Sequence, residues 1–156
     1  MKKSRKTLLI CLAIPLAIGG LSAWLSGSQM DTYQTLNQPP LSPPGWIFPI
    51  VWTVLYLLMG WASYRVYTAD VPELQSGRAL GIYILQLTVN LLWPIFFFNQ
   101  EWYLFSLLWL LLLWVLIWIM IILFARIDSS TWWMLAPYLI WVTFAAYLNW
   151  GVWILN

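Results

Sequence analysis

Long apolar runs dominate the pattern of hydrophobic and polar positions along the chain. A transmembrane helix needs roughly 20 mostly apolar residues. Five runs meet that length, and they cover residues 7–27, 46–67, 78–98, 102–124 and 132–153. The pattern therefore predicts an all-α integral membrane protein, a single domain over residues 1–156 that forms a five-transmembrane-helix bundle.

The first run follows a basic segment, as the apolar part of a secretion signal does. Lys2, Lys3, Arg5 and Lys6 precede it. The apolar stretch continues to about Leu25, which is longer than the apolar region of an ordinary signal peptide. We therefore expect this run to be the first helix of the bundle.

One of the four connections between the helices is much longer than the others. Residues 28–45 form it, and the sequence from Gln38 to Gly45 contains four prolines. Proline fixes its own φ and restricts the residue before it, so this loop should be stiff. A long, stiff loop in an otherwise minimal bundle is a candidate functional element. We expect it to cap a ligand site; a plain spacer between two helices is the alternative.

The composition supports the membrane assignment and excludes several kinds of chemistry. Charged residues make up 8% of the chain and hydrophobic residues 63%, whereas soluble domains carry about a quarter charged residues. Histidine is absent, which excludes Ser-His-Asp and Cys-His catalysis and zinc binding by imidazole. Cys11 is the single cysteine, so no metal site is expected. A net charge of +2 without a basic stripe makes nucleic acid an unexpected partner.

The basic residues predict the orientation of the bundle. With five spans, all seven fall on the side of the N-terminus: Lys2, Lys3, Arg5, Lys6, Arg65, Arg78 and Arg126. The other side, with residues 28–45 and the C-terminus, has neither lysine nor arginine. The positive-inside rule therefore predicts a cytoplasmic N-terminus, with the long loop and the C-terminus on the outer side.

The 14 tryptophans need an explanation. Many lie near predicted helix ends, where indole rings sit among lipid headgroups. Trp52, Trp93 and Trp141 lie deeper, at ~9, ~8 and ~18 Å from the outer surface at a rise of ~1.5 Å per residue. Three helices thus place indoles beneath the stiff loop, although spacing alone leaves open whether the rings face one another.

Asn90 lies close to one of these tryptophans in the predicted third helix. A buried amide is costly in hydrocarbon unless it is hydrogen-bonded, and polar side chains in such helices face protein or a cavity. Trp93 is three residues after Asn90, and Gln86 is one turn before it on the same face. The two amides either contribute to a ligand site or tie helices together.

These features together indicate the kind of ligand that a site would take. Aromatic walls, a few amides and a stiff cap suit a flat, apolar molecule with little charge. All five acidic residues lie in predicted loops: Asp31, Asp70, Glu73, Glu101 and Asp128. Ion-coupled transport normally uses charged groups within the membrane, so we do not expect it here.

Three ordered segments resemble the translocator protein family, also called tryptophan-rich sensory proteins (TspO/MBR). They are PPLSPPGWIFPIVWTVLY at 39–56, NLLWPIFFF at 90–98 and PYLIWVTFAAYLN at 137–149. The resemblance implies a five-helix bundle, commonly a homodimer, with a pocket that opens toward the long loop. It also implies the plasma membrane of a bacterium as the location.

The resemblance implies a ligand and the residues that bind it. Family members bind porphyrins such as protoporphyrin IX, sterols in some lineages, and isoquinoline-type compounds; the porphyrin is a ligand, and no cofactor is required. By position, the pocket residues are Tyr33, Pro43, Trp52, Tyr56, Asn90, Trp93, Trp141 and Ala145. The basic residue that ends the sterol pattern in animal members is missing here, which argues against sterol transport.

The expected function is therefore that of a membrane receptor or carrier for porphyrins and similar planar molecules, with a regulatory or stress-response role. Two alternatives stay open. The first is light-dependent degradation of bound porphyrin, in which Trp52 and Trp141 would be the reactive residues. The second is transport of hydrophobic molecules, for which the chain lacks an intramembrane charge.

Overall fold

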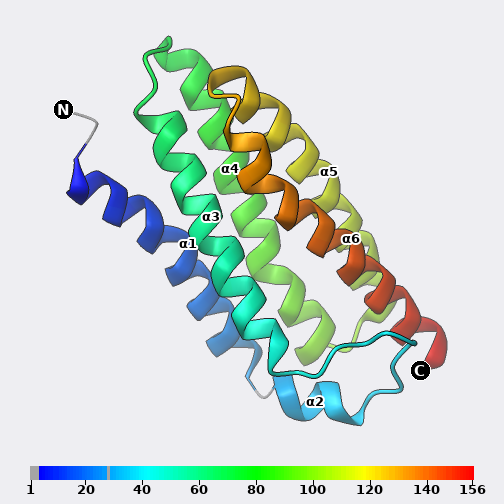
Figure 1. Ribbon diagram of the computed structural model, residues 1–156. Helices are drawn as coiled ribbons and strands as arrows, with labels where there is room; N and C mark the ends of the chain where they lie inside the picture. The colour runs from blue at the N-terminus through cyan, green and yellow to red at the C-terminus, as the bar shows by residue number, and fades with distance from the viewer. Residues whose placement is uncertain (1–3, 28) are drawn as a thin grey trace.

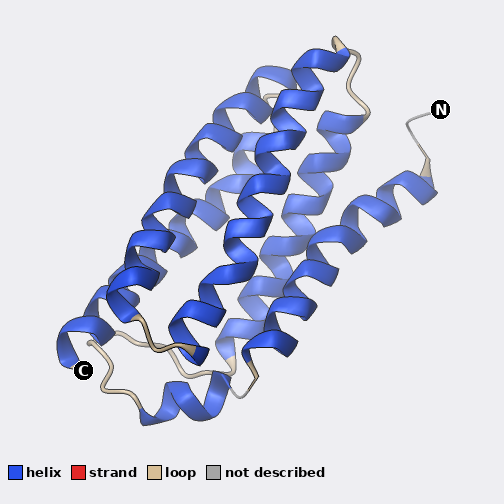
Figure 2. Ribbon diagram, turned by 180° about the vertical axis from the view of Figure 1, so that it is seen from behind, coloured by secondary structure: helices blue, strands red, loops and turns tan. Residues whose placement is uncertain are grey.

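The computed structural model describes residues 4–27 and 29–156, and all regular structure in these residues is helical (Figures 1 and 2). In chain order the elements are α1 (Arg5–Ser26), α2 (Gln29–Thr35), α3 (Ile47–Tyr67), α4 (Glu73–Pro94), the π-helix η1 (Ile95–Asn99), α5 (Tyr103–Ile127) and α6 (Thr131–Leu155). In this described part of the chain, five helices, with η1 continuing α4, are long and apolar enough to cross a membrane. The prediction of an all-α, five-helix membrane protein is confirmed.

The helices differ from the predicted runs mainly at their ends. Within the loop predicted over residues 28–45, the structure forms the short helix α2; residue 28 itself lies outside the described residues. α4 begins at Glu73 rather than at residue 78. Pro72 precedes this helix and Glu73 is in its first turn, and both features favour a helix N-terminus. A search for apolar runs does not detect such a polar turn, because the turn lies outside the hydrocarbon region of the bilayer.

Helices α3 to α6 form the body of the bundle, and α1 packs along its edge against α3 and α4 (Figure 1). The N-terminal end of α1 diverges from the bundle in both ribbon views. Only Pro15, Ser22 and Ser26 of α1 are buried. The first helix is therefore a peripheral wall that packs mainly against α3.

Glycine allows α1 and α3 to approach each other closely. A Cβ atom built on Gly60 would lie 2.6 Å from the carbonyl oxygen of Cys11 and 2.8 Å from the Cα of Leu12. Gly19, nearer the other end of α1, lies against the ring of Tyr56 of α3. Small residues at such contacts let helix backbones pack directly in a bilayer.

Pro94 ends the regular hydrogen bonding of α4. Proline has no N–H to donate, and the chain continues from it as the π-helix η1. The hydroxyl of Ser22 on α1 donates to the Leu91 carbonyl at 3.0 Å, and the Asn99 amide donates to the Leu25 carbonyl at 2.8 Å. The irregular end of α4 is thus tied to α1.

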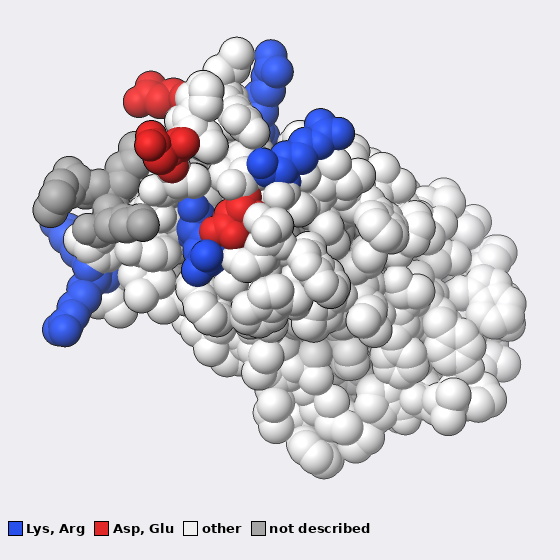
Figure 3. Space-filling view, turned by 45° about the horizontal axis from the view of Figure 1, so that its top comes forward, with Lys and Arg blue, Asp and Glu red and all other residues white. Residues whose placement is uncertain are grey.

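Basic side chains gather at one end of the bundle (Figure 3). This is the end at which α3 and α5 end and α4 begins (Figure 1). The basic residues in the described part of the chain are Arg5, Lys6, Arg65, Arg78 and Arg126. At this end Arg65 Nε and Asp128 Oδ2 form an ion pair of 2.7 Å between α3 and the α5–α6 connection. Burial raises the pKa of the Asp128 carboxyl, but hydrogen bonds from Ser130 and Arg65 outweigh it and hold the pKa below its ordinary value.

Candidate ligand-binding site

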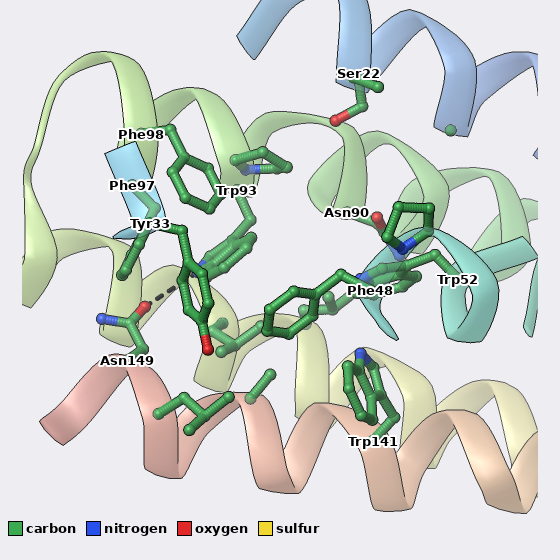
Figure 4. Close-up of a pocket in the computed structure, with 18 of the residues that line it drawn as sticks. Ser22, Tyr33, Phe48, Trp52, Asn90, Trp93, Phe97, Phe98, Trp141 and Asn149 are labelled. Carbon is green, nitrogen blue, oxygen red and sulfur yellow. Dashed lines mark hydrogen bonds between the residues drawn. The ribbon is translucent and has the colours of Figure 1, made fainter. Parts of the chain in front are cut away.

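A cavity of about 390 Å³ lies in the half of the bundle next to α2 (Figure 4). Side chains from all five long helices and from the segment before α3 line it. Its volume falls within the range of about 300–1,000 Å³ that is usual for small-molecule sites. The fold therefore offers one well-defined space for a ligand beneath the long connection.

Aromatic rings from three helices form much of the cavity wall. Trp52 of α3, Trp93 of α4 and Trp141 of α6 all line it. Trp52 stacks on Tyr56 with ring centroids 5.5 Å apart, and Trp93 stacks on Phe97 at 5.0 Å. These contacts hold the indoles in fixed orientations, as a preformed site for a flat molecule requires. The three indoles do meet at one cavity.

The segment between α1 and α3 covers the cavity. Tyr33 of α2 is only 8% exposed, and its ring packs edge-on against Phe48 at 5.1 Å. Its hydroxyl donates to the Pro43 carbonyl at 2.5 Å, while the Gln38 amide donates to the Tyr33 carbonyl at 2.6 Å. We call α2 and residues 36–45 the lid.

Hydrogen bonds also fix the lid to the C-terminal end of α6. The Tyr147 hydroxyl donates to the Pro40 carbonyl at 2.7 Å. The side-chain amide of Asn156 donates to the Asn37 carbonyl at 2.9 Å, and the Asn37 backbone N–H donates to the Asn156 side chain at 3.3 Å. Because these bonds join residues more than 100 positions apart, the lid is part of the tertiary structure and more than a spacer.

A buried polar network connects α3, α4 and α6 at the floor of the cavity. The Tyr56 hydroxyl donates to Asn90 Oδ1 at 3.1 Å, and Asn90 Nδ2 donates to the Tyr138 hydroxyl at 2.7 Å. Tyr138 in turn donates to Gln86 Oε1 at 2.7 Å. The two amides of α4 thus tie helices together, which was one of the two interpretations of the sequence. Asn90 also lines the cavity, so it belongs both to the polar network and to the candidate ligand site.

Asn149 is a site residue that the sequence analysis did not single out. Its Oδ1 accepts from the Trp93 indole N–H at 3.0 Å, and its Nδ2 donates to the Tyr103 carbonyl at 2.8 Å. The residue lines the cavity and is 1% exposed. It therefore sets the orientation of Trp93. Like Asn90, it is an amide within an apolar run, and this signal in the sequence could have identified it.

Trp52 and Trp141 offer hydrogen-bond donors to a ligand. Within the described residues, neither indole N–H has a partner, whereas that of Trp93 is used by Asn149. Figure 4 shows the indole nitrogen of Trp141 directed into the cavity. A ligand with a carbonyl or ring-nitrogen acceptor could bind these donors. No charged side chain is found among the described residues that line the cavity.

Seven of the eight residues predicted by resemblance line the cavity. They are Tyr33, Trp52, Tyr56, Asn90, Trp93, Trp141 and Ala145. Pro43 does not; its carbonyl instead accepts the hydroxyl of Tyr33 and so fixes the lid. Apolar lining residues that sequence reasoning missed include Phe48, Phe97, Phe98, Leu110, Leu113 and Leu148. Nothing in the sequence separates them from ordinary core residues.

We expect lid closure to be insensitive to pH between about 6 and 9. Burial raises the pKa of the Tyr33 hydroxyl, although the nearby Ser42 hydroxyl opposes it. A raised pKa keeps the hydroxyl protonated below the ordinary tyrosine value near 10, so its bond to Pro43 weakens only at higher pH. Amide hydrogen exchange of residues 29–45, corrected for its intrinsic pH dependence, checks this. Loss of protection between pH 6 and 9 would contradict it.

Comparisons with known proteins agree with this architecture. The model of the TspO/MBR family matches residues 11–154. The tryptophan-rich protein TspO of Chlorobaculum tepidum is 34% identical over 100% of this chain and 99% of its own length. The protein CrtK of Rhodobacter capsulatus is 36% identical over 80% of this chain and 78% of its own. The human translocator protein is 31% identical over 85% of this chain and 79% of its own length.

Proposed function

This chain belongs to the TspO/MBR family, and from this premise we propose that it is a membrane receptor or carrier for porphyrins such as protoporphyrin IX and for similar planar, apolar molecules. The ligand binds in the cavity under the lid, and binding serves a regulatory or stress-response role. The names of relatives, a sensory protein and a translocator protein, agree with either a receptor or a carrier.

The aromatic cavity is the single observation that carries this proposal. Trp52, Trp93 and Trp141 supply large apolar faces from three helices, and stacking on such faces favours flat ring systems. The uncharged wall disfavours a ligand whose charge must be buried, because an unpaired charge is costly in an apolar site. The carboxylates of a porphyrin would therefore remain near the polar lid, and its ring system would lie among the indoles.

The charge distribution supports an orientation for the protein. Basic side chains gather at the end opposite the lid (Figure 3), and the described residues at the lid end include neither lysine nor arginine. Basic residues are enriched on the cytoplasmic side of membrane proteins. We therefore place the N-terminus in the cytoplasm and the lid on the outer side of the plasma membrane.

Titration of the purified protein with protoporphyrin IX in the dark tests the proposed function. We expect saturable quenching of tryptophan fluorescence by wild-type protein. Trp52→Leu and Trp141→Leu each remove an indole from the wall, and each should weaken binding by about 2 kcal/mol, roughly thirtyfold, as loss of a large buried contact does. Absence of saturable binding to folded wild-type protein would refute the proposal.

Trp118→Leu is the matched control. This residue lies on α5, is 43% exposed and does not line the cavity, so its replacement should leave affinity unchanged. Repeating the titration under illumination separates binding from light-dependent degradation. Product that accumulates beyond one equivalent per protein, and is lost in the Trp52 and Trp141 variants, would favour an enzyme.

A further inference from the structure

The cavity reaches the side of the bundle between α1 and α3. Five of its lining residues are also exposed on the molecular surface, and together they mark this opening: Leu16, Gly20 and Ala23 of α1, and Pro49 and Thr53 of α3. Positions three or four apart share one face of a helix. The two sets therefore form two facing edges of a single opening.

The packing of α1 on α3 explains where this opening lies. The two backbones are in close contact at Gly60, where an added Cβ atom would collide with Cys11 and Leu12. Nearer the lid, Gly19 lies against the ring of Tyr56, whereas a Cβ atom built on the neighbouring Gly20 would meet no atom within 4 Å. Gly20 therefore leaves an unobstructed space at the edge of the cavity.

Polar groups at this opening are satisfied within the protein. The Thr53 hydroxyl donates to the Pro49 carbonyl of its own helix at 2.7 Å. The Ser22 hydroxyl, beside the opening, donates to the Leu91 carbonyl at 3.0 Å. Polar groups that face hydrocarbon must find internal partners. The edges of the opening are thus suited to contact with lipid chains.

The side of the cavity that faces the lid is closed in contrast. Tyr33 is nearly buried and bonded to Pro43, and the Asn37–Asn156 bonds hold the lid against α6. Access from water would require these bonds to break. Access through the opening between α1 and α3 requires no rearrangement of the lid.

We propose that planar apolar ligands enter the cavity from the hydrocarbon of the bilayer, through the opening between α1 and α3, while the lid stays closed. Gly20 keeps this route open because it has no side chain. A poorly soluble ring system partitions into the bilayer, so its concentration is highest where the opening lies. This inference rests on the proposed function, since it concerns how the same cavity is filled.

The test measures how fast ligand binds from the membrane. Proteoliposomes are mixed with liposomes that carry protoporphyrin IX, and tryptophan quenching is followed in time. Gly20→Trp should slow both association and dissociation by about tenfold or more, with affinity changed by less than about threefold, because it obstructs the route in both directions. Should this variant fail to fold, Ala23→Trp obstructs the same opening.

Leu21→Trp is the matched control, since it adds the same side chain to the neighbouring position. Leu21 is 42% exposed and does not line the cavity, so binding should proceed at the wild-type rate. A second experiment fixes the lid. Asn37→Cys with Asn156→Cys, in a Cys11→Ser background, is bridged by a short bis-maleimide across the existing contact. The bridged protein should bind as fast as the unbridged one.

The outcomes separate this inference from the proposed function. A Gly20→Trp rate equal to that of Leu21→Trp overturns lateral access, and so does loss of binding when the lid is bridged. If unmodified protein never binds protoporphyrin IX, the proposed function is the part that fails.

Discussion

Gly60→Leu should lower the free energy of unfolding by about 3 kcal/mol, the upper part of the usual range for overpacking. A side chain at this position would collide with the backbone of α1 at Cys11 and Leu12, and backbone cannot move aside as a flexible side chain can. Because α1 supplies one wall of the cavity, we also expect loss of ligand binding. Unfolding of the micelle-embedded protein by a denaturing detergent, followed by circular dichroism, measures the first effect.

Gly81→Leu is the control for this substitution. Gly81 lies in α4, is exposed, and a Cβ atom there would meet nothing within 4 Å. The same change of residue should therefore not destabilise the protein, and the gain in helix propensity over glycine should raise the free energy of unfolding by up to about 1 kcal/mol. Equal destabilisation by both variants would show that the α1–α3 contact at Gly60 is not the cause.

Tyr138→Phe should destabilise the protein by about 2 kcal/mol, the cost of leaving buried polar groups without partners. The Tyr138 hydroxyl accepts from Asn90 and donates to Gln86, so its removal affects two buried amides at once. Asn90 would then keep only its bond from the Tyr56 hydroxyl, and the floor of the cavity would be less firmly held. Denaturation measures the loss of stability, and protoporphyrin IX titration should show weaker binding.

Tyr83→Phe provides the comparison for Tyr138→Phe. Tyr83 is also a buried tyrosine, 3% exposed, but its hydroxyl has no hydrogen-bond partner among the described residues. Removing an unsatisfied hydroxyl should be neutral or stabilising. If Tyr83→Phe proved as destabilising as Tyr138→Phe, loss of the network would not explain the effect.

The membrane-spanning helices could be predicted from the sequence because each one is marked by the summed hydrophobicity of its own residues. Each run needs only enough apolar residues to match the bilayer, whatever it packs against. Hydrophobicity does not mark the exact ends of the helices, and it does not reveal α2. Glu73 and most residues of α2 are polar. The start of α4 depends on local features of the chain, and α2 is held by contacts with the rest of the lid, such as the Gln38–Tyr33 bond.

The sequence did not show which residues of different helices come together at the site. Gly20, Gly60 and Gly81 look alike in an apolar run, yet one adjoins the cavity opening, one touches a backbone and one faces open space. Their positions in the sequence placed Trp52 and Trp141 in the outer half of the membrane without showing that they share a cavity. Such distinctions arise from how the helices are rotated and crossed, which spacing along one helix does not encode.

A structure of the protein with bound protoporphyrin IX would show whether the ligand occupies the cavity under the lid. We expect the macrocycle to lie between Trp52 and Trp141 beneath Tyr33, with one edge toward Gly20. A macrocycle bound instead on the outer surface of the bundle, against Leu12 and Trp61, with the cavity under the lid unfilled, would contradict it.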